Sequence, residues 1–249
     1  MAVVLHGACV VRDLTEGDYV HSGTTKVWDQ FSLKEGGESL SLRMIQADPG
    51  LSPGFSPIPN DDVLFCTEGR GIIWIGGNPY PLEADTAYFI PAHHAFCLRQ
   101  DDETPATLVS SQYPEPRPTE FTEPQTDTQS LSEIPPMARL WEQESQTSGE
   151  RWYRVLLDRR QNSNRITQLV GAIPPGRAPN HEHSFDEVIV ILRGVGRMWA
   201  GDRSTPLKPG SCVFLPKNQT HCIENTGADE VRLLGIFARP SDPGSGFIF

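Results

Sequence analysis

The segment Pro174–Gly196, PPGRAPNHEHSFDEVIVILRGVG, decides how the rest of this 249-residue chain is interpreted. It places His181, His183 and Glu187 at spacings i, i+2 and i+6. Side chains alternate along an extended strand, so all three point to one face. On a helix the two imidazoles would lie about 200° apart. An apolar, β-branched run, VIVIL, follows Glu187 at once and predicts a strand.

A second segment, Gly210–Asn225, reads GSCVFLPKNQTHCIEN and carries one more histidine, His221. Three neutral imidazole nitrogens and one carboxylate oxygen suit a first-row divalent metal with open coordination positions. We therefore expect one divalent transition metal per chain, Fe, Mn, Ni or Zn. The expected ligands are His181, His183, Glu187 and His221.

These two segments resemble the paired motifs of the cupin superfamily, G-x5-H-x-H-x3-4-E-x6-G and G-x5-P-x-G-x2-H-x3-N. Gly176 stands one residue nearer to His181 than the first motif has its glycine, and Asn218 replaces the middle glycine of the second. Asparagine tolerates the left-handed backbone conformation, so that departure is mild. The residues that match are His181, His183, Glu187, Gly194, Gly210, Pro216, His221 and Asn225.

An internal repeat predicts the architecture. A shift of 125 residues aligns Gly69 with Gly194, Trp74 with Trp199 and Pro91 with Pro216, without gaps. The shared residues are turn glycines, turn prolines and strand hydrophobics, which specify a backbone. We expect an all-β chain with two tandem cupin (jelly-roll β-barrel) domains, the metal ligands pointing into the second barrel.

The first copy lacks the ligand set. The same shift places Ser56, Ile58, Asp62 and Phe96 at the four ligand positions. One carboxylate in four positions argues against a metal there, so this copy is interpreted as structural or ligand-binding. His93 and His94 lie in the corresponding turn, either as a displaced site or as polar turn residues, and the second interpretation is favoured.

The expected domains are 1–113, an N-terminal cupin without metal ligands, and 151–249, a C-terminal metal-binding cupin. Between them, 114–150 is rich in proline and acidic residues and reads as a linker with one possible short helix. The resemblance also implies that the N-terminal segment adds a strand to the sheet of the other domain.

Composition excludes several function classes. The net charge of −11 argues against nucleic acid and against anionic membrane surfaces. No apolar run reaches the ~18 residues of a membrane span, and the N-terminal stretch does not read as a signal peptide. The five cysteines form no C-x-x-C pair, which favours reduced thiols and a cytoplasmic location.

The position of the other polar residues along the strands, and their counterparts in the repeat, indicate their roles. Asn225 is expected to bond the backbone, and Trp199, which has a counterpart in Trp74, is expected to pack. An anionic substrate would need a cation beside the metal. The candidates for substrate contact are Arg197, Gln168 and Arg177.

Function follows from the expected coordination set. A metal with open positions in an apolar barrel favours an enzyme acting on a small oxygen-rich metabolite, first an Fe(II)-type dioxygenase or oxidase. The first alternative is a non-redox metalloenzyme: a lyase, isomerase or hydrolase. The layout is similar to that of the ureidoglycine aminohydrolase family, although that family's Glu at the first ligand position and Gln in the second motif are not shared. The second alternative is a non-catalytic small-molecule binding cupin. The resemblance also makes a homodimer an expected assembly.

Overall fold

The computed structural model describes residues 2–31, 40–114, 116–127 and 134–238, and their regular secondary structure is almost entirely β-strand. The all-β prediction is confirmed. The chain forms two compact units. The described residues within 17–142 and 157–163 form one, here called the N-terminal barrel. Those within 1–16, 143–156 and 164–249 form the other, here called the C-terminal barrel.

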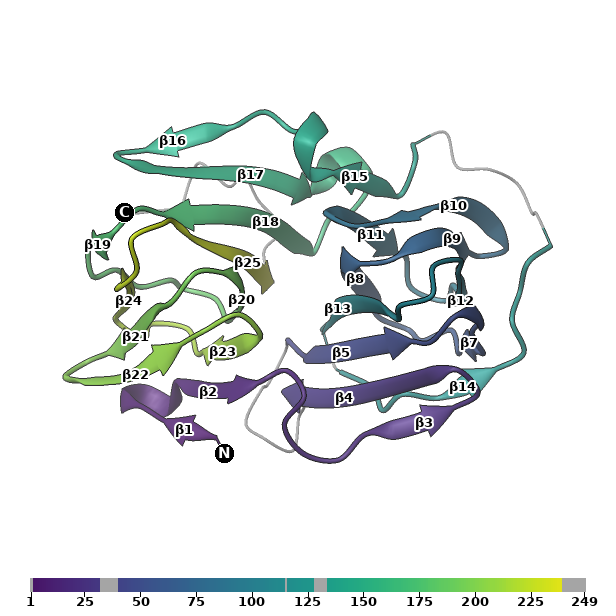
Figure 1. Cartoon of the computed structure of the whole chain (residues 1–249), viewed down its shortest axis with the longest axis horizontal. Coiled ribbons are helices and arrows are strands. Elements are labelled where there is room, and N and C mark those ends of the chain that lie inside the picture. The colour runs from purple at the N-terminus through teal and green to yellow at the C-terminus, as the bar shows by residue number, and fades with distance from the viewer. Residues whose placement is uncertain (1, 32–39, 115, 128–133, 239–249) are drawn as a thin grey trace. The chain divides into compact units, whose positions relative to one another are not determined.

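The N-terminal barrel is built from two antiparallel sheets (Figure 1). The first has the strand order β15 (Met137–Arg139), β11 (Thr86–Ile90), β8 (Asp61–Glu68), β13 (Ala106–Tyr113), β5 (Leu42–Ala47), β4 (Thr25–Phe31) and β3 (Val20–Ser22). The second has the order β10 (Asn78–Glu83), β9 (Arg70–Ile75), β12 (Phe96–Gln100), β7 (Gly54–Phe55) and β14 (Phe121–Thr122), with β6 (Gly50–Leu51) paired to β12.

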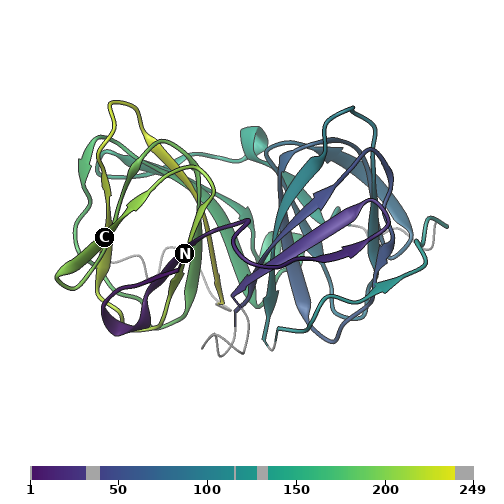
Figure 2. The same cartoon turned by 60° about the horizontal axis from the view of Figure 1, so that its bottom comes forward.

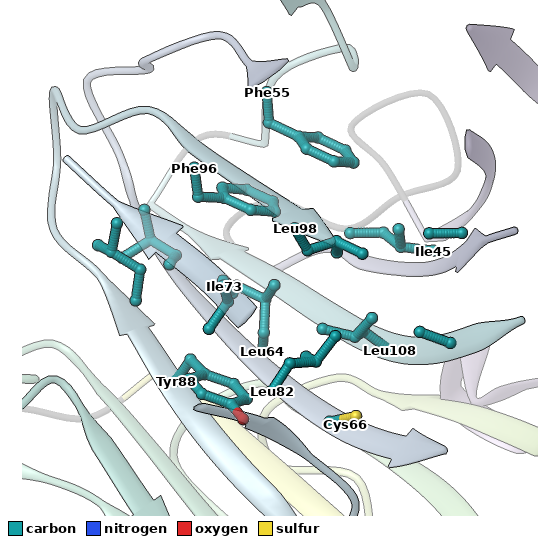
Figure 3. Close-up of a cluster of buried hydrophobic side chains, with 14 of the residues drawn as sticks. Ile45, Phe55, Leu64, Cys66, Ile73, Leu82, Tyr88, Phe96, Leu98 and Leu108 are labelled. Carbon is teal, nitrogen blue, oxygen red and sulfur yellow. The ribbon is translucent and has the colours of Figure 1, made fainter. Parts of the chain in front are cut away.

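Alternating side chains of these two sheets fill the space between them with one apolar core (Figure 3). Ile45, Leu64, Ile73, Leu98 and Leu108 are fully buried in it. They come from strands of both sheets, as the period of two predicts. Each such side chain stabilises the fold by roughly 1.5–3 kcal/mol relative to an exposed one.

The C-terminal barrel repeats this plan, and each unit closes around its own interior (Figure 2). Its larger sheet has the order β1 (Val3–Val4), β2 (Val10–Asp13), β23 (Ser211–Leu215), β20 (Glu187–Arg193), β25 (Val231–Ala238), β18 (Ile166–Ile173), β17 (Arg151–Leu157) and β16 (Gln146–Ser148). Its smaller sheet has the order β19 (Gly176–Arg177), β24 (His221–Asn225), β21 (Gly196–Ala200) and β22 (Arg203–Leu207).

The N-terminal segment belongs to the C-terminal barrel, as the family resemblance implied. β2 pairs with β23 in antiparallel register, with Val11 opposite Val213. Val11 and Cys9 are buried in the same apolar cluster as Val213. The sequence boundary at residue 113 stays a prediction, but residues 1–16 extend the sheet of the second barrel.

The segment 114–150 is more ordered than a plain linker. β14 pairs with β7, β15 pairs with β11, and β16 pairs with β17. The short helix expected there is one 3-10 turn, Leu140–Glu142. Residues 115 and 128–133 of this segment lie outside the described part of the chain.

All five cysteines are buried and free. Burial raises the pKa of the Cys66 and Cys212 thiols to about 12, so both stay protonated. None of the described helices has the length and apolar character that a membrane crossing needs.

Phe55 and Phe96 occupy the place that two ligand histidines hold in the other barrel. Phe96 on β12 pairs with Phe55 on β7, just as His221 pairs with His181 in the other barrel. The centroids of the two stacked phenyl rings are 4.2 Å apart. The ungapped repeat had placed Ser56 at this position. The structure corrects that match by one residue, because the first copy has one extra residue between Phe55 and Ile58.

A buried ion pair lies beside these rings. Arg43 Nη2 donates to Asp62 Oδ2 at 2.5 Å, and Arg43 Nε donates to Ser110 Oγ at 2.9 Å. Ser110 Oγ donates in turn to Asp62 Oδ1 at 2.7 Å. Asp62, the only carboxylate that survives from the ligand set, is thereby paired with a guanidinium. The remaining hollow measures only about 10 Å³.

This pairing predicts a large stability effect. The variant Arg43→Met leaves the Asp62 carboxylate buried without its cation, which should cost about 3–5 kcal/mol in the free energy of unfolding. The double variant Arg43→Met with Asp62→Leu removes both charges and should recover most of the loss. Urea unfolding of both variants and the parent measures this. A double variant as unstable as the single one would contradict the account.

Candidate metal centre

Backbone pairing brings the two motifs together. The His181 amide donates to the His221 carbonyl at 3.0 Å, and the His221 amide donates back to His181 at 2.9 Å. The Asn218 amide donates to the His183 carbonyl at 2.5 Å. Asn218 has a φ of +62°, the left-handed conformation that the sequence predicted for it. These three bonds fix the register between residues almost forty positions apart in the chain.

Four side chains converge on one point. One ring nitrogen from each of His181, His183 and His221 lies within 4.8 Å of the other two. Glu187, the first residue of β20, places its Oε2 3.3 Å from His183 Nε2 and 4.0 Å from His221 Nε2. Three imidazole nitrogens and one carboxylate oxygen fit a divalent transition metal.

Backbone carbonyls orient two of the rings. His221 Nδ1 lies 2.8 Å from the Gln219 carbonyl, and His181 Nδ1 lies 3.1 Å from the Pro179 carbonyl. A carbonyl only accepts, so Nδ1 carries the proton in both rings. The lone pair of each Nε2 is then left to bind an ion, and the ring orientation is fixed from outside.

Burial sets the charge state of the cluster. It lowers the pKa of His181, and it lowers the pKa of His221 to about 4. Burial alone would raise the pKa of Glu187, but the hydrogen bond from His183 and the surrounding imidazoles hold it below its usual range. At neutral pH both rings are therefore neutral and Glu187 is ionised, which are the forms that bind a metal.

Gly235 makes room for this carboxylate. A Cβ at Gly235 would lie 3.2 Å from Glu187 Oε1, tighter than ordinary packing. By strand register, Gly235 and Leu169 correspond to Ser110 and Arg43 of the N-terminal barrel. Arg43 and Ser110 bind Asp62 in the N-terminal barrel, whereas Leu169 and Gly235 have no side-chain group that could bind Glu187 in the C-terminal barrel.

The four side chains line a cavity of about 90 Å³ within the C-terminal barrel. That volume holds a small molecule of a few non-hydrogen atoms. Most of its wall is aliphatic, formed by Leu169, Ile173, Ile189, Ile223 and Leu233. Hydrogen-bonding side chains near its mouth come from Ser148, Arg151 and Tyr153.

The three residues expected to contact substrate line no part of this cavity. Gln168 alternates with Leu169 along β18, so it points to the opposite face of the sheet, where it is completely buried. Arg197 is the neighbour of the core residue Met198 along β21, so its side chain lies on the opposite face of the strand. There it donates a hydrogen bond to Ser204 Oγ at 3.1 Å. Arg177 stacks over the Trp199 ring at 4.2 Å.

Two other sequence-based interpretations are confirmed. Asn225 bonds only backbone: its Nδ2 donates to the Ile173 and Asp229 carbonyls, both at 2.8 Å. Trp199 packs under Arg177 and donates to Glu224 Oε2 at 2.8 Å, outside the cavity.

His93 and His94 lie in a turn of the N-terminal barrel. His93 takes the left-handed turn position that Asn218 takes in the other barrel, with a φ of +67°, and its amide donates to the Ile58 carbonyl. Within the described ranges, the cluster of His181, His183 and His221 is the one group with metal-ligand geometry. The interpretation of His93 and His94 as turn residues agrees with this.

Sequence reasoning missed the residues at the cavity mouth. Ser148, Arg151 and Tyr153 belong to the hairpin β16–β17, which was assigned to the end of the linker and the start of the domain. Nothing in their local sequence, QTSGERWY, shows that the hairpin lies beside the ligands. Only the tertiary fold places them there.

Comparison with known families identifies both barrels. The sequence pattern of the family described as "Cupin domain" matches residues 45–111 and 169–237, together more than half of the chain. The chain belongs to the cupin family. The two matches, one in each barrel, also confirm the internal repeat, and this cupin is a two-domain member.

Curated relatives of this cupin match over one domain only. Auxin-binding protein 1 from Arabidopsis thaliana is 33% identical over 76 residues, which are 27% of this chain and 38% of that protein. An oxalate-binding protein from Thermotoga maritima is 32% identical over 66 residues, 26% of this chain and 54% of that protein. The aligned segments thus span well under two thirds of these relatives.

Solved structures match this cupin over both domains. A variant of oxalate decarboxylase from Bacillus subtilis superposes with a TM-score of 0.77 over 92% of this chain and 77% of that one, at 15% identity. Another structure of that enzyme, described by its Mn(II) centres, gives a TM-score of 0.76 over 93% and 78% at the same identity. At such identity the likeness shows the fold alone.

The charge state of the ligands predicts a pH dependence. The unfolded chain protonates His221 near its ordinary value of 6.5, whereas the folded chain does so only at about 4. The unfolded state therefore binds more protons between these values, so stability is full above about pH 6.5 and is lost as pH falls toward 4. The loss from His221 is up to about 3 kcal/mol.

Urea unfolding of chelator-treated protein between about pH 7 and about pH 4.5 measures this loss. The variant His221→Gln, which cannot titrate there, should show a flatter profile over the same range. Identical profiles for the parent and the variant would contradict the assignment of a buried neutral imidazole at this position.

Proposed function

We propose that this cupin is a metal-dependent enzyme that acts on a small oxygen-rich metabolite in its C-terminal barrel. One divalent transition metal per chain would be held by His181, His183, Glu187 and His221. The observation that carries the proposal is the convergence of these four side chains on one mainly apolar cavity. A barrel that served only as scaffold would not need three buried polar side chains and a half-buried histidine there.

The residues of the chain prepare the site in three ways. The carbonyls of Pro179 and Gln219 fix the two imidazole rings. Glu187 supplies the single negative charge, held by its contacts with the histidines. The aliphatic wall keeps bulk water out, which strengthens electrostatic effects inside. A bound divalent ion would supply Lewis acidity toward a carbonyl or water, and Fe or Mn would add redox chemistry.

Our first form of the proposal is an oxygen-dependent reaction, an Fe(II)-type dioxygenase or oxidase. The three-imidazole, one-carboxylate set supports it, because it suits redox-active metals and leaves coordination positions for substrate and oxygen. A small hydroxy acid, enol or diketone would present two neighbouring oxygens to such an ion.

The second form is a non-redox reaction of the lyase type. The likeness in fold to oxalate decarboxylase, with its Mn(II) centres, favours this candidate. A third form, a non-catalytic binding protein, is suggested by relatives named for binding auxin or oxalate. The homodimer and the cytoplasmic location stay predictions from the sequence.

Metal content tests the site itself. The variants His183→Ala and His221→Ala should each lose tight metal binding, because each removes one of four ligands. The matched control replaces His93 and His94 together by Ala and should keep about one metal per chain. Elemental analysis of the purified proteins measures this. Full metal content in both ligand variants, or a clear loss in the control, would contradict the assignment.

Oxygen uptake separates the forms of the proposal. Protein reconstituted anaerobically with Fe(II) should consume oxygen when supplied with one of a panel of hydroxy acids and diketones. Turnover without oxygen consumption, in the Mn form, would move the assignment to a lyase. If metal and ligand bind without any turnover, the assignment changes to a non-catalytic binding protein. An absence of metal after reconstitution would refute the proposal.

A further inference from the structure

A hairpin supplies the only positive charge in the described wall of the metal cavity. β16 and β17 are joined by a two-residue turn, Gly149–Glu150, and Ser148 pairs with Arg151 across its end. Gly149 has a φ of +61°, as tight hairpin turns require. Both residues of the closing pair line the cavity. The hairpin therefore brings a guanidinium to the mouth of the metal site.

Arg151 lines the same cavity as the four proposed metal ligands. Arg151 itself is half-buried, and burial lowers the pKa of its guanidinium. A cation kept partly out of water beside an apolar cavity gains more from an anionic partner than an exposed one does.

Tyr153 supports the placement of this side chain. It is two residues further along β17, so it lies on the same face as Arg151 and also lines the cavity. Its hydroxyl donates to Gln146 Oε1 at 2.7 Å, across the hairpin. This bond ties β16 to β17 at the end of the ladder away from the turn, and so helps to hold the register that pairs Arg151 with Ser148.

The rest of the wall limits what the ligand can be. Apart from the metal ligands and the residues of the hairpin, the described lining is aliphatic. One guanidinium can neutralise one carboxylate, and the leucine and isoleucine side chains of the wall would pack against a short apolar chain, which a dianion such as oxalate lacks. The wall therefore favours a monoanion with a short apolar remainder over a dianion such as oxalate.

We propose that Arg151 is the substrate-binding residue that receives a carboxylate, and that the substrate class is a short 2-oxo or 2-hydroxy monocarboxylate. The proposal rests on the proposed function, since the second oxygen donor would face the metal position. A guanidinium binds a carboxylate through two parallel N–H donors, which fixes the orientation of the acid. The aliphatic wall then receives the short carbon chain.

Ligand binding to the full-length, Mn-loaded protein tests this without using turnover. Isothermal titration calorimetry would compare 2-oxobutyrate with pentane-2,3-dione, a neutral diketone of similar size, and with oxalate. The parent should bind 2-oxobutyrate at least tenfold more tightly than either. Arg151→Gln should weaken 2-oxobutyrate binding at least tenfold and leave the diketone unchanged, and Arg151→Lys should recover part of the affinity. The matched control is Arg203→Gln, an exposed arginine outside the cavity, which should change nothing.

The outcomes separate this inference from the proposed function. Elemental analysis of the same samples reports the metal. If the metal is present but 2-oxobutyrate does not bind the parent, or if Arg151→Gln weakens acid and diketone equally, this inference is overturned and the metal site stands. Oxalate binding tighter than 2-oxobutyrate would also overturn it. If no metal binds after reconstitution, the proposed function fails, and this inference with it.

Discussion

Two backbone hydrogen bonds between His181 and His221 are the contact on which the rest of the site depends. Each histidine alone is one residue of an ordinary strand or loop. Paired in both directions, and held by the Asn218 amide on the His183 carbonyl, they bring three imidazoles to the first residue of β20. Because the pairing is backbone to backbone, the metal geometry is a consequence of sheet register, and the barrel must fold correctly before four ligands can meet.

The two barrels show what the same backbone does with different side chains. At the place of His181 and His221, the N-terminal barrel stacks Phe55 on Phe96. Its one remaining carboxylate, Asp62, is neutralised internally by Arg43. In the other barrel Leu169 and Gly235 stand at the positions of Arg43 and Ser110, so Glu187 contacts the histidines instead of a guanidinium. Removing an ion from a buried site requires another way to compensate the charge, and the guanidinium of Arg43 provides it.

Much of this could be predicted from the sequence, because periodicity and turn residues are local signals. The i, i+2, i+6 spacing indicated three of the four proposed ligands, and the repeat indicated two barrels and the turn role of His93. The repeat also maps β12 onto β24. The one-residue shift at Phe55 escaped an ungapped match, since only strand pairing reveals it. The position of Arg151 could not be predicted, because a hairpin carries no mark of the cavity it will border. The sequence shows that the side chains of Gln168 and Leu169 point to opposite faces of a strand. It does not show which of these two faces lines the interior of the barrel.

The central claim is that one barrel of this cupin binds a transition metal and the other has replaced it by an internal ion pair. Anomalous X-ray diffraction from crystals of the metal-loaded protein, collected at the absorption edge of that metal, tests it most directly. The account predicts one peak per chain, at about 2.0–2.2 Å from nitrogens of His181, His183 and His221 and from an oxygen of Glu187. A peak beside Asp62 in the N-terminal barrel, or no peak among the four predicted ligands, would contradict it.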